Sequence, residues 1–443
     1  MFDLIIRGGT VITAEGPREA DLAIVDGRIV AFEEGPAAKE EIDARGWHIF
    51  PGVIDSHLHF NEPGRTDWEG GRTGSHALAA GGGTAFCDMP LNSTPCTTNA
   101  AEFSRKHEAL AASSITDFGL WGGLVPGNLN QLAGLADAGV IGFKAFLSNS
   151  GLPEFQHSDD LTLLEGMREA ARLNLPVSVH AENDAITHHL SQRALAHGRT
   201  GVRDFLAARP VIAEVEAISR ALLFAEETQA SLHIVHVSSG RGVAVAAEAR
   251  ARGVDVTIET CPHYLFFTVE DVERIGVAAK CAPPIRAEDD REALWAAVLD
   301  GTLDLIASDH SPAPPEQKSG DFFRAWGGIA GVQSTLAVLL EGHHTRGLPL
   351  ARIAHLLAGK PAARYRLANK GRVEVGYDAD LALVELGVPY RLEHLHQRHA
   401  ISPYLGHTFR GVVRRTIRRG ETIFADGHIT ARSSGKLLKP CTN

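Results

Sequence analysis

The chain has 443 residues, of which 44% are hydrophobic and 22% are charged, as in globular proteins with a sizeable core. The formal net charge of −11 argues against a nucleic-acid partner. No apolar run approaches the roughly 18 residues of a membrane span, and the start MFDLIIRGG is too short and too charged for a signal peptide. Five scattered cysteines without a C-x-x-C pair indicate a reduced, cytoplasmic protein.

The first 50 residues have the pattern of short strands with tight turns. Asp3–Thr10 and Asp21–Phe32 are β-rich, and the second contains an Asp26-Gly27 pair between apolar residues. Such a pair is typical of a hairpin turn. We therefore expect a small sheet here.

From residue 50 onward, short apolar runs alternate with longer helical patterns. The predicted strands are Ile49–His59, Gly83–Met89, Thr116–Trp121, Val140–Phe146, Pro176–His180, Ser231–Val237, Val254–Thr260 and Leu303–Asp309. The helical patterns between them are Leu164, Met167, Ala171; Ile212, Val215, Ile218, Leu222; and Leu294, Val298 before Gly301. Eight β-then-α units predict an α/β fold, the (β/α)₈ barrel, over residues 51–370. A doubly wound sheet is the alternative, but its usual Gly-rich turn is missing after the first strand.

Short strands return beyond residue 370. They are predicted at Asp378–Val384, Val412–Arg418 and Glu421–Phe424, and a second turn pair, Asp426-Gly427, follows. Because both terminal segments share this character, we expect residues 1–50 and 371–443 to form one small β-sandwich domain beside the barrel.

The stretch Phe50–Arg65 carries two histidines at the end of the first predicted barrel strand. Side chains alternate along a strand, so His57 and His59 point to the same side and could bind one metal ion. In a chain with 22 histidines, a chance pair is the competing interpretation. The ends of the other strands decide between the two.

In such barrels the reactive residues lie at the carboxyl ends of the strands. The predicted strands carry six candidate ligands there: His57, His59, Lys144, His180, His236 and Asp309. Four imidazoles and a carboxylate suit zinc and similar ions. Because one catalytic zinc usually takes three protein ligands and a water, the set predicts two divalent ions that share a bridging hydroxide.

Lys144 differs from the others because an ammonium group cannot bind a cation. A neutral lysine, however, reacts with carbon dioxide to give a carbamate whose two oxygens can bridge two metal ions. Burial beside cations favours the neutral amine that this reaction needs. We expect Lys144 to be N6-carboxylysine; a buried lysine paired with an acid is the simpler alternative.

The remaining histidines are not assigned to the metal site. We expect His233 to point to the other face of its strand, His263 to contact substrate or stabilise a loop, and His310 to face away from Asp309. Surface positions are expected for His188, His189, His343, His344, His394 and His396.

This ligand order resembles the cyclic-amidohydrolase branch of the amidohydrolase superfamily, which includes dihydroorotases, hydantoinases and allantoinases. The resemblance covers essentially the whole chain. Four segments resemble allantoinases in particular: Asn61–Gly70, Met89–Asn92, Asp309–Lys318 and Trp326–Ile329. Dihydroorotases usually carry an arginine two residues after the second histidine, where this chain has Asn61, and a neutral amide cannot bind a carboxylate as a guanidinium does. Hydantoinases typically lack the EPGR and WEG elements that this chain has between residues 62 and 70.

The resemblance implies hydrolysis of the cyclic amide of allantoin to allantoate, a step of purine catabolism, with Asp309 as general base and then acid. It also implies zinc as the metal (with cobalt, manganese or iron as alternatives) and a homotetramer. Substrate contacts are implied for Asn92, the backbone near Cys281, Trp326 and Gly327. The alternatives are hydantoinase, dihydropyrimidinase or dihydroorotase activity on a related ring, a mononuclear deaminase, and a non-catalytic scaffold of the same fold.

Overall fold

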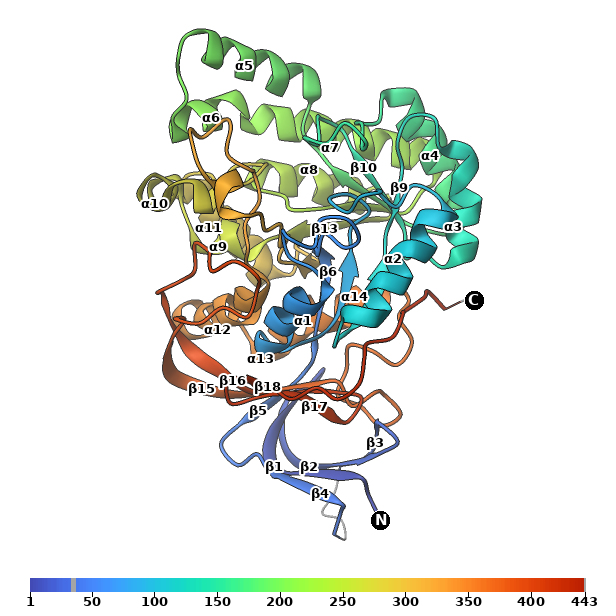
Figure 1. Ribbon diagram of the computed structural model, residues 1–443, viewed down its shortest axis with the longest axis vertical. Coiled ribbons are helices and arrows are strands. Elements are labelled where there is room, and N and C mark those ends of the chain that lie inside the picture. The colour runs from blue at the N-terminus through green and yellow to red at the C-terminus, as the bar shows by residue number, and fades with distance from the viewer. Residues whose placement is uncertain (33–36, 442–443) are drawn as a thin grey trace.

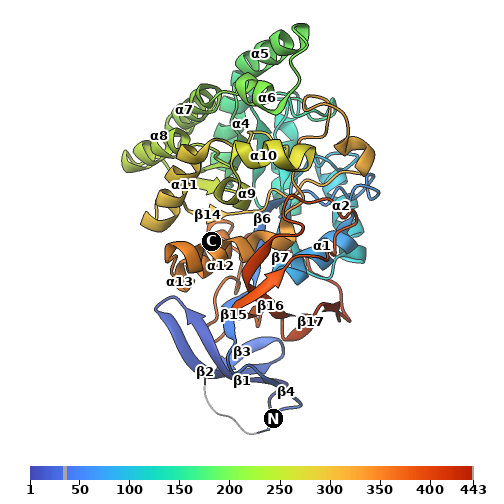
Figure 2. The same ribbon diagram turned by 90° about the vertical axis from the view of Figure 1, so that its left-hand side faces the viewer.

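The computed structural model describes residues 1–32 and 37–441. A barrel of alternating strands and helices occupies the upper part of Figure 1, and a sheet built from both ends of the chain lies below it. Figure 2 shows the same two layers from the side, with the N-terminal strands next to the C-terminal ones. No helix in the described part of the chain is long and apolar enough to span a bilayer.

The barrel strands are all parallel and pair in chain order. They are β6 (Val53–Leu58), β7 (Gly83–Asp88), β8 (Asp117–Leu120), β9 (Gly122–Gly123), β10 (Phe143–Phe146), β11 (Val177–His180), β12 (Leu232–Ile234), β13 (Val256–Thr260) and β14 (Leu305–Ile306). Only Trp121 separates β8 from β9, so these two act as one strand that pairs with β7 and then with β10. After β14, the amide of Asp309 donates to the carbonyl of His57 at 2.9 Å, which brings the last strand end beside the first. The predicted (β/α)₈ barrel is confirmed.

Helices follow each barrel strand and cover the outside of the barrel. They are α1 (Gly71–Ala80), α2 (Ala100–Ser113), α3 (Leu132–Ala138), α4 (Asp160–Arg172), α5 (Asp184–Ala196), α6 (Val202–Ala208), α7 (Val211–Thr228), α8 (Gly240–Ala251), α9 (Pro262–Phe266), α10 (Val269–Ile275), α11 (Glu288–Asp300), α12 (Thr335–Arg346), α13 (Leu350–Ala354) and α14 (Lys360–Arg364), with a π-helical turn at His355–Gly359.

The predicted helical faces agree with the structure in part. In α11, Leu294 and Val298 are buried and Gly301 ends the helix with φ 91°. In α4, the buried face contains Leu163, Met167 and Ala170. Met167 agrees with the expected pattern, while the other two buried residues each precede the expected residue by one position.

The second layer is a nine-stranded sheet that both termini build. Its strands are β1 (Leu4–Thr13), β2 (Gly16–Val25), β3 (Arg28–Ala31), β4 (Glu40–Asp43), β5 (His48–Pro51), β15 (Leu381–Arg391), β16 (Thr408–Arg418), β17 (Glu421–Ala425) and β18 (His428–Ile429). The two halves join where β5 pairs antiparallel with β15, for example Ile49 opposite Leu383. Asp26 and Asp426 adopt positive φ in the hairpin turns expected from the sequence.

A buried ion cluster ties this sheet to the barrel. The ammonium of Lys370 contacts carboxylate oxygens of Asp117 at 2.8 Å, Asp378 at 3.0 Å and Asp380 at 2.5 Å. Asp117 begins strand β8 of the barrel, and Asp380 directly precedes β15 of the sheet. Arg419 also donates to Asp117, so two cations face the three carboxylates at this junction.

Candidate metal centre

Three of the predicted ligands converge where the first and last barrel strands end. His57 lies within β6 and His59 directly follows it, while Asp309 follows β14. An oxygen of Asp309 lies 3.2 Å from Nε2 of His57 and 3.5 Å from Nε2 of His59. Their ligand atoms all lie within 4.8 Å of one another, which is the spacing that one metal ion requires.

His180 and His236 form a second pair beside the first. Nδ1 of His180 lies 3.0 Å from Nε2 of His236, so both nitrogens face the same point. The ring centroids of His57 and His236 are 5.4 Å apart, which places the two groups of ligands side by side. Burial lowers the pKa of His57, His180 and His236 below the ordinary value, and the neutral imidazole is the form that binds metal.

Lys144 lies on β10, next to the strand β11 that carries His180, and is fully buried. Its amine has no hydrogen-bond partner among residues 1–32 and 37–441, and it lies 5.2 Å from the ring centroid of Phe146. Burial lowers the pKa of the Lys144 amine to about 8. A buried amine without a hydrogen-bond partner fits a carbamate-bearing metal site better than a structural ion pair.

Two buried carboxylates contact ring nitrogens of the predicted ligands, and neither was identified from the sequence. Glu259 on β13 contacts Nδ1 of His57 at 2.8 Å and Nε2 of His233 at 3.1 Å. Glu182 contacts Nε2 of His180 at 2.9 Å. A carboxylate on the far ring nitrogen fixes which nitrogen faces the metal site. A charged residue inside the apolar strand VTIET was the available signal for Glu259.

Glu182 in turn accepts a hydrogen bond from Arg209, whose side chain also lines the cavity. Burial alone would raise the pKa of Glu182, but the Arg209 guanidinium and His180 outweigh it and lower that pKa to about 2. Glu182 is therefore ionised and can orient His180.

The backbone is strained where the ligands lie. His236 has φ 41° and Asp309 has φ 45°, both in the left-handed region. Such a conformation costs on the order of 1–3 kcal/mol for each residue without a glycine's freedom, and strain of this kind clusters at functional sites. Asn92, with φ 69°, is a third such residue at the same cavity.

An open cavity of about 460 Å³ lies above these ligands. Asn92, Trp326 and Gly327 line it together with His57, His59, His180, His236 and Asp309. The Cys281 thiol instead donates to the carbonyl of Pro283 at 3.2 Å and lines a separate small cavity, while the neighbouring Ala282 lines the large one. Ala282, and not Cys281 itself, therefore faces the large cavity.

The histidines left out of the ligand set lie elsewhere. His263 is buried and packs edge-on to Tyr264, and burial lowers its pKa to about 4. His310 accepts backbone hydrogen bonds at Nδ1 from Gly331 and Val332. His188 lines the outer rim of the large cavity.

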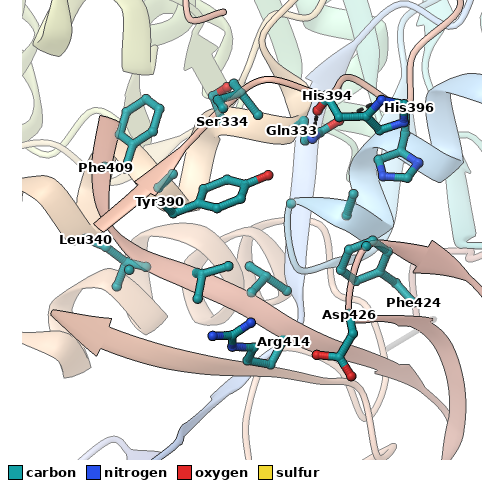
Figure 3. A pocket seen from close by; sticks show the side chains of 18 residues that line it. Gln333, Ser334, Leu340, Tyr390, His394, His396, Phe409, Arg414, Phe424 and Asp426 are labelled. Atoms are coloured by element: carbon teal, nitrogen blue, oxygen red, sulfur yellow. Dashed lines mark hydrogen bonds between the residues drawn. The ribbon is translucent and has the colours of Figure 1, made fainter. Parts of the chain in front are cut away.

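A second cavity, of about 400 Å³, lies between α12, the end of α1 and the terminal sheet. Figure 3 shows Tyr390, Phe409 and Leu340 on one side of it and His396 and Phe424 on the other. Its histidines follow β15 of the sheet and not a barrel strand. The cavity lined by His57, His59, His180, His236 and Asp309 is therefore the candidate active site.

Comparison with known proteins assigns the family. The model of the amidohydrolase family matches residues 48–423, which includes the whole barrel. The chain belongs to the amidohydrolase family. This agrees with the resemblance in the sequence and with a hydrolase acting on cyclic amides.

Individual members of the family match over full length. An allantoinase from Solibacter usitatus is 63% identical, with 100% of this chain and 98% of that protein covered. An allantoinase from Deinococcus radiodurans is 54% identical, with 99% of each covered. Among solved structures, the L-hydantoinase (dihydropyrimidinase) from Arthrobacter aurescens is 32% identical, has a TM-score of 0.96 and covers 99% of this chain and 100% of its own.

Proposed function

We propose that this amidohydrolase opens the cyclic amide of allantoin to give allantoate. The observation that carries the proposal is the set of histidines and Asp309 at the carboxyl ends of the barrel strands, in a chain 63% identical over its full length to an allantoinase. The family is metal-dependent, and the neutral, buried imidazoles fit that requirement.

Two divalent ions, zinc in the first instance, would be held by residues already in place. His57, His59 and Asp309 would hold one ion, His180 and His236 the other, and carboxylated Lys144 would bridge them. The ions would supply a water of lowered pKa and polarise the ring carbonyl. The buried amine of Lys144 has no hydrogen-bond partner among the described residues, and this supports the carbamate.

Asp309 is the residue proposed to move the proton. Its carboxylate contacts both histidines of the first strand and also lines the cavity, so it can take a proton from the attacking water. The same carboxyl group then delivers that proton to the leaving ring nitrogen, which completes opening of the ring.

The substrate would lie between the ligands and the opposite wall of the cavity. Asn92 offers an amide, the backbone near Cys281 offers peptide groups through Ala282, and Trp326 with Gly327 forms the far wall. A flat, polar ring that carries both N–H and C=O groups suits this mixture of amide and aromatic surfaces.

The related rings are the nearest rivals. Hydantoinase structures match with TM-scores of 0.96 and 0.92 at about a third sequence identity, which is lower than the identity to allantoinases. Asn61, at the position of the dihydroorotase arginine, is buried, and its amide nitrogen lies 3.5 Å from the carbonyl of Pro312. It therefore offers no cation for the carboxylate of dihydroorotate.

The proposal includes the organisation of the molecule. Residues 1–50 with 371–443 are proposed as a small β-sandwich domain and 51–370 as the catalytic barrel, in a cytoplasmic homotetramer that acts on a small molecule. Size-exclusion chromatography with light scattering would measure the assembly, and a monomer would contradict it.

The decisive experiment measures turnover and metal content on one sample. Purified protein would be assayed on allantoin, hydantoin, dihydrouracil and dihydroorotate side by side, with metal stoichiometry by mass spectrometry. We expect the highest kcat/KM on allantoin with two ions per chain. A higher kcat/KM on another ring would reassign the substrate, one ion with full activity would favour the mononuclear alternative, and no metal or turnover would favour a scaffold.

A further inference from the structure

The segment Ser319–Gly328, here called the strap, forms part of the wall of the active-site cavity. It follows the 3₁₀ turn Pro315–Lys318 and contributes Phe323 through Gly327 to the lining of the cavity. The strap contains no helix or strand, so its position depends on its contacts with other elements.

Aromatic contacts hold the strap to two other segments. Phe322 and Phe323 pack edge-on to Phe205 of α6, with ring centroids 5.5 and 5.6 Å away. Trp326 packs edge-on to Trp68 at 4.8 Å. The strap thus bridges from α6 to the segment that follows β6.

Lys280 holds the middle of the strap. Its side chain is buried, and its amine donates to the carbonyls of Phe323, at 3.2 Å, and of Ala325. The amine also lies 4.8 Å from the ring centroid of Phe205. Lys280 itself lines the cavity, directly below the residues it holds.

Lys318 holds the last part of the strap from the other side. Its amine donates to the carbonyls of Trp326, at 3.0 Å, and of Gly328, and reaches Val277 at 3.3 Å. Trp326 and Gly327 are the proposed substrate contacts, so the carbonyls beside them are fixed by this one amine.

Burying these two amines costs free energy that no ion pair in the described part of the chain offsets, so we attribute their presence to a role at the active site and not to stability. Neither forms an ion pair with a carboxylate of the described residues, whereas the buried Lys370 pairs with three aspartates. Burial lowers the pKa of Lys280 to about 8 and of Lys318 to about 7, so the charged form is disfavoured. An apolar side chain would avoid this penalty, but it would leave the strap carbonyls without donors.

We propose that Lys280 and Lys318 are positioning residues that fix the strap and thereby set the cavity wall against which the substrate ring binds. In either protonation state, each amine has at least two N–H donors for the strap carbonyls. The proposal rests on the proposed function, because Trp326 and Gly327 act on the substrate only if the ring lies in this cavity.

The test compares K280M and K318M with wild-type holoenzyme. Methionine keeps an unbranched side chain, one heavy atom shorter than lysine, but removes every donor. We expect KM for allantoin to rise at least tenfold, kcat to change less than threefold, and metal content to stay the same. Amide hydrogen exchange in Ser319–Gly328, measured without substrate, should accelerate. K360M is the matched control, because Lys360 pairs with Asp304 at 2.9 Å at the other end of the barrel.

An unchanged KM with unchanged strap exchange would overturn the proposal, even if the melting temperature fell as in K360M. If the methionine variants do not fold, K280Q and K318Q carry the same test, because an amide keeps donors but is too short to reach both carbonyls. If wild-type protein does not hydrolyse allantoin, the proposed function fails. The exchange data, together with KM on whichever ring is hydrolysed, then still decide the role of the lysines.

Discussion

Glu259 gives the sharpest test of how the metal centre is built. In wild-type protein its two oxygens lie 2.8 Å from Nδ1 of His57 and 3.1 Å from Nε2 of His233. Glutamine at this position has one oxygen and one NH₂ group, so one imidazole N–H would meet a donor. Since His57 is one of the proposed ligands, its free nitrogen would lose its fixed orientation.

We expect E259Q to weaken metal affinity by 10- to 100-fold, which corresponds to about 1.4–2.7 kcal/mol. The affinity would be measured by competition with a chromophoric chelator and checked by metal analysis after dialysis. D304N is the matched control, because Asp304 is also a buried carboxylate, paired with Arg250 at 2.7 Å and distant from the ligands.

The reasoning would be refuted by an E259Q protein whose metal affinity stays within threefold of wild type while its stability falls as in D304N. That result would make Glu259 a structural acceptor only. A loss of affinity in both variants would instead indicate that general loosening of the barrel, not orientation of His57, controls metal binding.

Three further outcomes are expected. D309N should lower kcat by at least about 10²-fold while largely retaining metal, and near-normal kcat would contradict the proton-transfer role. K144A should bind fewer metal ions per chain and also lose activity. If both values stay unchanged, a mononuclear site would be favoured. K370M should lower the free energy of unfolding by about 3–5 kcal/mol, since it leaves the buried carboxylates of Asp117 and Asp380 without their ammonium, and a urea midpoint equal to wild type would contradict this.

Much of the fold was predictable because its signals are local. Apolar runs that alternate with helical patterns predicted the barrel strands in their correct order, and the Asp-Gly pairs predicted two hairpin turns. The buried face of α4 was misplaced by one residue, because a 3.6-residue repeat cannot tell which side of a moderately apolar helix faces the barrel.

The functional residues were predictable to the extent that strand ends reveal them. The pattern H-x-H and single polar residues after apolar runs identified His57, His59 and Asp309, which the structure brings together. Glu259 lies 202 residues from the histidine that it contacts, and the strap lysines bind backbone carbonyls, for which the sequence carries no pattern.

The sequence alone therefore determined which chemical groups the barrel presents at its mouth, because the strand period and the parallel order place the end of every strand on one face. Only the tertiary structure decided how each group is used. Which nitrogen of His57 or His180 faces the site depends on the carboxylate behind it. The wall of the cavity depends on two amines that meet the strap from different elements. Glu259 and Lys280 lie far along the chain from the residues that they contact, and only packing brings them together.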